Sequence, residues 1–221
     1  MKKGLIEFNW KYIDSYSEED ISYFLFLEGK SIDTISRIRN LDKSIIQKHI
    51  INGKIKFRYF IKNNSIDEFF RTINSASKDE KSLIVQNLNI VIQKKLIKYI
   101  NENYADFSPN EKQKAVWILG ELKDPDSLKV LIKASVNKIV NVRRMAISAM
   151  NKLNDSKCEE HLIRALYDEN PQVVLYSIKG LQNLHSNKAI EHVIKLKNIW
   201  KKDYLLREGE KLLNIMGFKE E

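Results

Sequence analysis

The chain has 221 residues, and its 38 Lys and Arg against 29 Asp and Glu give a net charge of +9, which suits a polyanionic partner. Few Gly and Pro favour long helices with short connections. A single Cys excludes an internal disulfide and suits a reducing compartment. The first residues carry two lysines with no apolar run behind them, so we expect no signal peptide, and no apolar run approaches the ~20 residues of a membrane span. We therefore expect a cytoplasmic protein with no membrane partner.

Two short helices are predicted near the start of the chain. The stretch EEDISYFLFLEGK, from residue 18, predicts a helix that ends at Gly29. Ser31 is then a candidate N-cap for a second helix, because a serine hydroxyl can accept from a free backbone N–H of the first turn. At helical spacing, the second helix carries Ile32, Ile35 and Ile38 on one face.

A third helix is predicted after a tight turn at residues 39–41, with Asp42 as its cap and Gly53 as its end. Ile46 and Ile50 lie one turn apart and should face the first two helices. The outward positions are then Lys43, Ser44, Gln47 and Lys48. The following residues, KIKFRYFIK, alternate basic and apolar types, which fits either a strand with a basic face or a helix.

This arrangement resembles a helix-turn-helix, of the kind found in sigma-like modules of bacterial regulators and in small units appended to some helicases. The resemblance rests on five consecutive residues: Ile46, Gln47, Lys48, His49 and Ile50. It implies that the four outward residues of the third helix enter the major groove of duplex DNA. There Gln suits adenine, Lys suits guanine or phosphate, and Ser suits either base edge.

The same outline can also serve as a plain three-helix fold or a protein docking unit. Ile45 and Ile51 are apolar near the outward side, and residues 43–53 contain no Arg, which favours this alternative. The DNA interpretation is favoured by the six basic residues and the absence of acidic ones between Lys43 and Lys62. The sequence leaves both interpretations open.

From about residue 66 the pattern is helical throughout, and it repeats. Three segments align without gaps from residues 115, 146 and 177, a constant spacing of 31 residues. Five columns stay apolar in all three: Val116, Ile147 and Ile178; Leu119, Met150 and Leu181; Leu122, Leu153 and Leu184; Leu131, Leu162 and Val193; Ile132, Ile163 and Ile194. Asp124 before Pro125, and Asn170 before Pro171, are candidate helix caps. Two helices per repeat predict a solenoid.

The repeats resemble HEAT repeats of the short bacterial kind, over about residues 79–218. Val142 and Arg143 match the usual Val-Arg of that family, whereas Val173 and Val174 depart from it. We expect an all-α protein, with a helix-turn-helix domain over residues 1–64 and a HEAT-like α-solenoid over residues 66–221.

A basic residue ends a triplet that recurs in the second helices: Lys98, Lys133, Arg164 and Lys195. The resemblance to HEAT arrays places these helices on a concave face. Glu160 and Glu191 precede two of the four by one turn, whereas Lys94 and Lys129 precede the other two and repel them. We expect the main basic patch of the solenoid at Lys94, Lys98, Lys129 and Lys133.

The residues that bear chemistry form no evident active site. His161 and His192 share a repeat column, which separates them by ~10 Å, too far for one zinc ion. Cys158 begins a helix, which can lower its pKa, but packing is the favoured role. Trp117, Glu121 and Arg143 are the set comparable to HEAT-like DNA glycosylases, and a Trp used only for packing is the favoured alternative.

We therefore expect a non-enzymatic DNA-associated or regulatory adaptor with no metal, cofactor or small-molecule substrate. Its helix-turn-helix would contact duplex DNA, and its solenoid would bind a protein or additional DNA. The alternatives are a pure protein-interaction scaffold and, less favoured, a HEAT-like DNA glycosylase.

Overall fold

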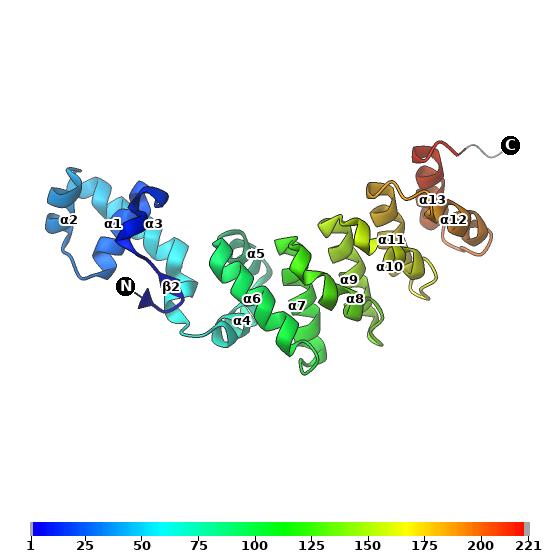
Figure 1. Ribbon diagram of the computed structural model, residues 1–221, viewed down its shortest axis with the longest axis horizontal. Helices are drawn as coiled ribbons and strands as arrows, with labels where there is room; N and C mark the ends of the chain where they lie inside the picture. Colours follow the sequence, from blue (N-terminus) through cyan, green and yellow to red (C-terminus); the bar gives the residue numbers. More distant parts are fainter. Residues whose placement is uncertain (1, 219–221) are drawn as a thin grey trace. The chain divides into compact units, whose positions relative to one another are not determined.

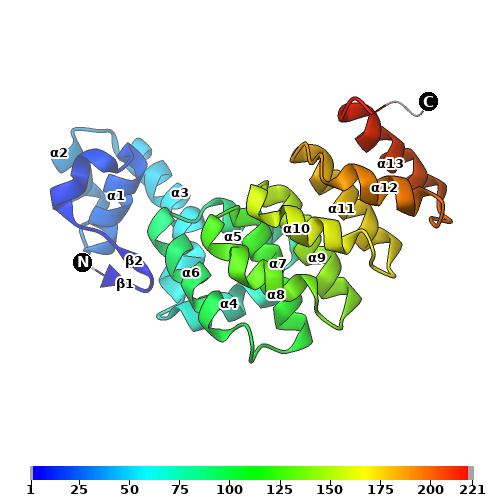
Figure 2. The same cartoon turned by 45° about the vertical axis from the view of Figure 1, so that its right-hand side comes forward.

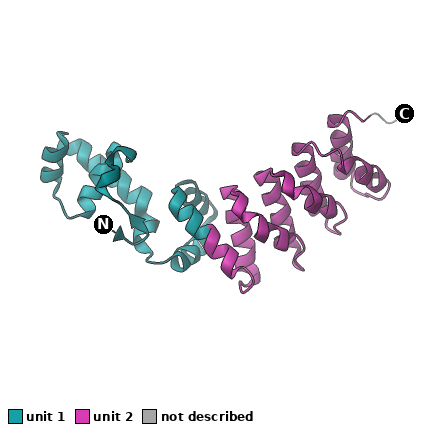
Figure 3. Ribbon diagram, in the orientation of Figure 1, with its two compact units in different colours: residues 1–96 teal, residues 97–221 magenta. Residues whose placement is uncertain are grey.

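The computed structural model describes residues 2–218 (Figure 1). Within them the fold is helical except for one pair of short antiparallel strands, β1 (Lys2–Lys3) and β2 (Ile6–Glu7). The chain forms two compact units, residues 1–96 and 97–221 (Figure 3). The predicted all-α class is confirmed, while the outer ends of the predicted domains, Met1 and residues 219–221, lie outside the described residues.

The N-terminal strands pack on the end of a long helix through Gly4. This glycine has a φ of +59°, and a Cβ there would collide with the carbonyl oxygen of Phe60. The next residue, Leu5, donates its backbone N–H to the same oxygen at 2.9 Å. A short 3-10 helix, η1 (Trp10–Ser15), follows, and Phe8 stacks on Phe24 with ring centroids 4.4 Å apart. The hairpin therefore forms part of the first unit's core.

Three helices make the helix-turn-helix: α1 (Glu18–Leu27), α2 (Ile32–Arg39) and α3 (Lys43–Lys62). Ser31 caps α2 as predicted, accepting from the backbone N–H of Thr34. Asn40 adopts the left-handed conformation, with a φ of 49°, that turns the chain between α2 and α3.

The predicted inward face of α3 is confirmed, but its predicted end is wrong, and Asp42 occupies the N-cap position without the predicted side-chain hydrogen bond. Ile46 and Ile50 are buried, whereas Gly53 lies inside a helix that continues to Lys62. Gly53 is buried, and a Cβ there would overlap the ring of Tyr23 on α1. The glycine therefore permits close packing of two helices and ends neither. Of the two alternatives for residues 54–62, the helix is correct.

The three isoleucines of α2 do not share one environment. Ile35 is fully buried, whereas Ile38 is 56% exposed. Ile38 lines an open groove that also contains Ile13 and Leu25. One turn of a short helix thus contacts the core, and the next leaves its apolar side chain at the surface.

Three further helices follow a loop at residues 63–65: α4 (Ile66–Ser75), α5 (Lys78–Gln86) and α6 (Ile90–Asn103). Phe69 on α4 packs against Phe60 on α3 with ring centroids 5.3 Å apart. The predicted domain boundary at residues 64–66 falls in the loop before α4, while the two compact units divide within α6.

The second unit is a stack of helix pairs in which α7 (Pro109–Leu122) packs on α9 (Val140–Leu153), α9 on α11 (Pro171–Asn183) and α11 on α13 (Asp203–Ile215) (Figures 1 and 2). First helices begin at residues 109, 140 and 171, which preserves the predicted spacing of 31. The second helices of the pairs are α8 (Leu128–Ser135), α10 (Glu159–Ala165) and α12 (Ala189–Lys197).

The turn between the helices of a pair repeats as closely as the helices do. Lys123, Asn154 and His185, each 31 residues apart, all have a φ between 50° and 52°. Asp124 then accepts from the backbone N–H of Asp126, and Asp155 accepts from that of Lys157. The predicted Asp124 cap is confirmed, although it begins a 3-10 turn, Pro125–Ser127, that leads into α8.

Three of the five predicted apolar columns are buried in every repeat, whereas in the column of Ile132, Ile163 and Ile194 only Ile163 is buried. The column of Leu122, Leu153 and Leu184 differs, because all three side chains are only half-buried. Each of these leucines lies at or beside the end of a first helix, where packing against the next repeat is incomplete. The presence of leucine at this position in all three repeats therefore did not indicate that its side chain is fully buried.

Candidate functional site

The outward face of α3 carries the residues predicted to contact DNA. Lys43, Ser44, Gln47 and Lys48 are all exposed. The adjacent side of the helix is occupied by contacts to α1, since His49 Nδ1 lies 3.0 Å from Ser22 Oγ and Asn52 Nδ2 donates to Glu19 at 3.0 Å. His49 therefore orients α3 against α1, which leaves the four predicted residues accessible.

Acidic residues from other helices neutralise part of the basic run on α3. Lys43 pairs with Asp33 at 2.7 Å, and this contact is the main reason why the pKa of Asp33 is lowered. Two further pairs form in the same way, Lys56 with Asp20 at 2.7 Å and Arg58 with Glu80 at 3.2 Å. These three acids lie outside the Lys43–Lys62 stretch, so a count over that stretch overestimates the available charge.

Lys48 and Lys62 form no ion pair with any described residue, and Lys54 lies 5.1 Å from the ring centre of Phe26. Ile51 and Ile55, 57% and 64% exposed, follow Gln47 and Lys48 along the outward side of α3. The candidate surface is thus polar and basic near the start of α3 and apolar near its middle.

The residues of the predicted solenoid patch are exposed, but their ion pairs differ from those expected. Lys98, expected to lack a carboxylate partner, lies 3.9 Å from Glu102. Glu160 binds Lys188 at 2.8 Å instead of Arg164, and Arg164 donates to Ser135 Oγ at 3.1 Å. The charge difference on which the predicted patch depended is therefore smaller in the structure.

Lys94 and Lys98 lie on α6 and Lys129 and Lys133 on α8, the residues of the predicted patch. All four side chains are exposed.

The histidines and the cysteine have local roles. His192 Nδ1 lies 2.7 Å from the hydroxyl of Tyr167, and burial lowers the pKa of His161. Cys158 is fully buried, and desolvation raises the pKa of its thiol to about 11, so the lowered pKa suggested by its position is wrong. No group of three or more His, Cys, Asp or Glu side chains suited to a metal ion occurs in residues 2–218.

The three residues compared with DNA glycosylases do not form a common site. Arg143 binds Asp168 through two hydrogen bonds of 2.6 and 3.0 Å, and it also donates to the carbonyl of Asn137 at 2.9 Å. Glu121 pairs with Lys152 at 2.5 Å. Both charged residues thus have structural partners.

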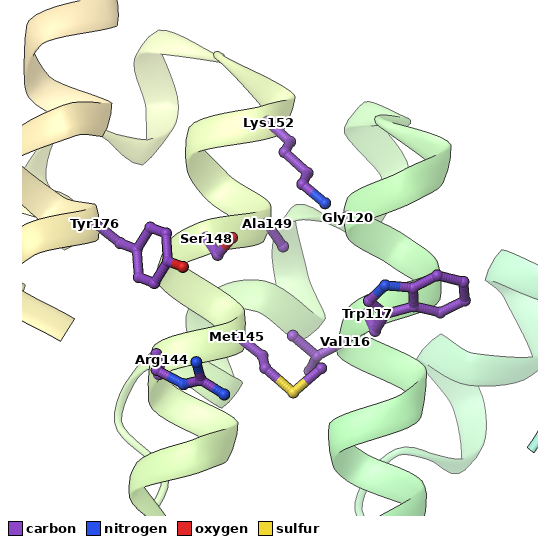
Figure 4. Close-up of a pocket in the computed structure, with 9 residues that line it drawn as sticks. All are labelled: Val116, Trp117, Gly120, Arg144, Met145, Ser148, Ala149, Lys152 and Tyr176. Atoms are coloured by element: carbon purple, nitrogen blue, oxygen red, sulfur yellow. The ribbon is translucent and has the colours of Figure 1, made fainter. Parts of the chain in front are cut away.

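Trp117 instead borders a pocket of about 80 Å³ between the first helices (Figure 4). Neighbouring first helices supply the other lining residues: Val116, Gly120, Arg144, Met145, Ser148, Ala149, Lys152 and Tyr176. Sequence reasoning identified Trp117 but missed Arg144, because Arg143 beside it matched the repeat pattern.

Comparison with known families agrees with this architecture. Residues 18–111 match the model of a helix-turn-helix domain, and residues 94–182 match the model of HEAT repeats. The chain therefore carries a helix-turn-helix domain followed by HEAT repeats. No curated protein matches the chain. None of the described helices is both long and apolar enough to cross a bilayer.

Proposed function

We propose that the protein is a non-enzymatic DNA-associated adaptor, in which α3 contacts duplex DNA and the HEAT repeats bind a protein or additional DNA. The observation that carries the proposal is the outward face of α3, where Ser44, Gln47 and Lys48 are exposed on the third helix of a helix-turn-helix. Such helices place their exposed residues in the major groove.

Each residue has a distinct expected role. Gln47 is suited to an adenine edge, whereas Lys48 supplies a charge for phosphate or guanine. Lys43 must break its ion pair with Asp33 before it can contact DNA, which reduces its contribution to DNA affinity. We expect Gln47→Ala to alter sequence preference. Lys48→Ala should weaken binding to every sequence and reduce the salt slope by about one unit.

The test is fluorescence anisotropy with random-sequence duplex DNA across a salt series. The full chain is compared with a triple variant, Lys43→Ala, Gln47→Ala, Lys48→Ala, and with a charge-matched control, Lys201→Ala with Lys202→Ala, at two exposed lysines of the second unit. Loss of binding in the triple variant alone supports the proposal. Equal binding by all three proteins would rule out major-groove contact by α3.

A second function is favoured by Ile51 and Ile55, which leave two large apolar side chains exposed on α3. Under this alternative the helix-turn-helix docks a protein and the whole chain is a scaffold. Substitution of both isoleucines by Ser would then abolish binding of the partner protein. Under this alternative the natural chain would also give no anisotropy change with duplex DNA at low salt.

The predicted basic patch is a further candidate for phosphate contact. If DNA also binds the solenoid, the pair Lys98→Glu and Lys133→Glu should lose more affinity at low salt than Arg164→Glu with Lys195→Glu. Because Glu102 lies near Lys98, we expect a smaller difference between the two pairs than like-charge stacking alone suggests. Equal losses would indicate a solvated charged face.

A further inference from the structure

The pocket beside Trp117 is lined by hydrogen-bond donors that have no acceptor. The guanidinium of Arg144, the indole Nε1 of Trp117 and the hydroxyls of Ser148 and Tyr176 make no hydrogen bond with the described residues. Arg144 Nε is buried as well as unpartnered. An arginine and a tryptophan can only donate. A buried donor without an acceptor is costly, so an acceptor from outside that reaches Arg144 Nε would stabilise the site, and the half-exposed donors of Trp117, Ser148 and Tyr176 lie beside it.

The charge of the pocket is positive. Lys152 is the only other charged side chain that lines it, and Glu121, outside the lining, already compensates that lysine. No carboxylate lines the pocket, whereas Arg143 immediately before Arg144 holds Asp168. Because Arg144 has no carboxylate partner among the described residues, the pocket favours binding of an anionic group.

Part of the pocket wall is apolar, and the volume of the pocket is small. Val116, Met145 and Ala149 form the walls beside the donors (Figure 4). A volume of about 80 Å³ is well below the roughly 300–1,000 Å³ of small-molecule and cofactor sites. It accommodates one or two side chains that project from a larger partner. Trp, Tyr, Arg and Met are also the residues enriched at the centres of protein interfaces.

From these contacts we infer that the pocket on the first helices of the HEAT repeats binds an acidic segment of a partner protein. A carboxylate side chain accepts from Arg144 and Ser148, while an adjacent apolar side chain packs against Trp117 and Met145. Nucleic acid is disfavoured because a phosphate chain needs successive cationic contacts, and this pocket offers one unpaired guanidinium. The inference rests on the part of the proposed function that assigns protein binding to the repeats.

The experiment uses the full chain and an array of short synthetic peptides. Each peptide contains Asp or Glu beside Leu or Phe, and its counterpart carries Asn or Gln instead of the acid. We expect the acidic member of bound pairs to bind about tenfold to hundredfold more tightly, the range of a charge-assisted hydrogen bond. Arg144→Gln should remove this preference, and Trp117→Ala should weaken both members.

The control is Arg207→Gln, at an exposed arginine on α13 that lies outside the pocket, and circular dichroism confirms folding of every variant. The inference is overturned if no peptide binds, if acidic and amide peptides bind alike, or if Arg144→Gln has no effect. It is also overturned if a single-stranded oligonucleotide binds through Trp117 and Arg144. Duplex binding through α3, measured on the same samples, fails or succeeds independently of these outcomes.

Discussion

Arg143 on α9 donates two hydrogen bonds, of 2.6 and 3.0 Å, to the carboxylate of Asp168, which lies in the loop that precedes α11. Only 16% of the arginine side chain and 10% of the aspartate side chain are exposed. The hydrogen bonds to Asp168 raise the pKa of Arg143. This ion pair fixes the start of one helix pair to the start of the next, and the equivalent position in the following repeat, Val174, is buried and apolar.

The Arg143–Asp168 pair should contribute measurably to stability. We expect Arg143→Ala to lower the free energy of unfolding by about 2–4 kcal/mol, because it leaves a carboxylate largely buried without its partner. Chemical denaturation monitored by circular dichroism measures the loss. The matched control is Lys152→Ala, which breaks the more exposed pair with Glu121 and should cost only about 0–1 kcal/mol. Similar losses in both variants would contradict the assignment.

Gly120 sets the distance between α7 and α9. A Cβ at this position would lie 2.8 Å from the Cβ of Ala149 and 3.1 Å from its Cα, atoms that cannot move aside. We expect Gly120→Ala to destabilise the protein by about 1–3 kcal/mol through overpacking. In Gly180→Ala the nearest atom is Leu162 Cδ1, at 2.9 Å, at the end of a flexible side chain. Gly180→Ala should therefore lower the free energy of unfolding less than Gly120→Ala does. A greater loss in Gly180→Ala would show that the rigidity of the contacted atoms does not determine the loss of stability.

The half-buried leucine column should be less sensitive to truncation than the buried one. Leu162→Ala removes a fully buried side chain and should cost roughly 2–5 kcal/mol through lost burial and a cavity. Leu153→Ala removes a partly exposed one, so we expect a value at or below the lower end of that range. Thermal melts of the two variants test the order, which equal losses would refute.

The Cys158 thiol should resist modification and should make stability depend on pH in the alkaline range. Its pKa rises from 9.0 to about 11 through burial, so the folded thiol stays neutral where the unfolded one ionises. Ionisation therefore favours the unfolded state, and this contribution to stability is complete below pH 9 and is lost as the pH rises toward 11.

Two measurements test the cysteine. A thiol reagent at pH 8 should label Cys158 only after denaturant is added, and rapid labelling of the folded protein would contradict its burial. The free energy of unfolding should fall between pH 9 and pH 11 more steeply in the natural protein than in Cys158→Ala, in which the other titrating groups are unchanged.

Regular features of this fold could be predicted from the sequence because their physical causes are local. The spacing of 31, the caps at Ser31 and Asp124, and the inward pair Ile46 and Ile50 follow from periodicity and hydrogen-bonding capacity. Gly53 was misassigned because a glycine inside a helix is recognised only when the approaching partner, here Tyr23, is known.

The charges of the candidate sites were harder to predict, because ion pairs form between residues distant in sequence. Asp33 and Asp20 form ion pairs with lysines on α3, and Glu160 pairs with Lys188 instead of with Arg164. The donors around Arg144 also come from separate repeats, so their convergence is a property of the stacked helices. No spacing within one repeat indicates it.

The recurring turn has a consequence for how the array can change length. Lys123, Asn154 and His185 turn the chain at equivalent positions, and Arg143 and Asp168 both lie between residues 140 and 170. Deletion of residues 140–170 would remove both members of the ion pair together. It would also join α8 to α11 with the repeat spacing of 31 residues unchanged. Loss of one such module would therefore leave neither Arg143 nor Asp168 without its partner, whereas it would separate Glu121 from Lys152 and Lys188 from Glu160.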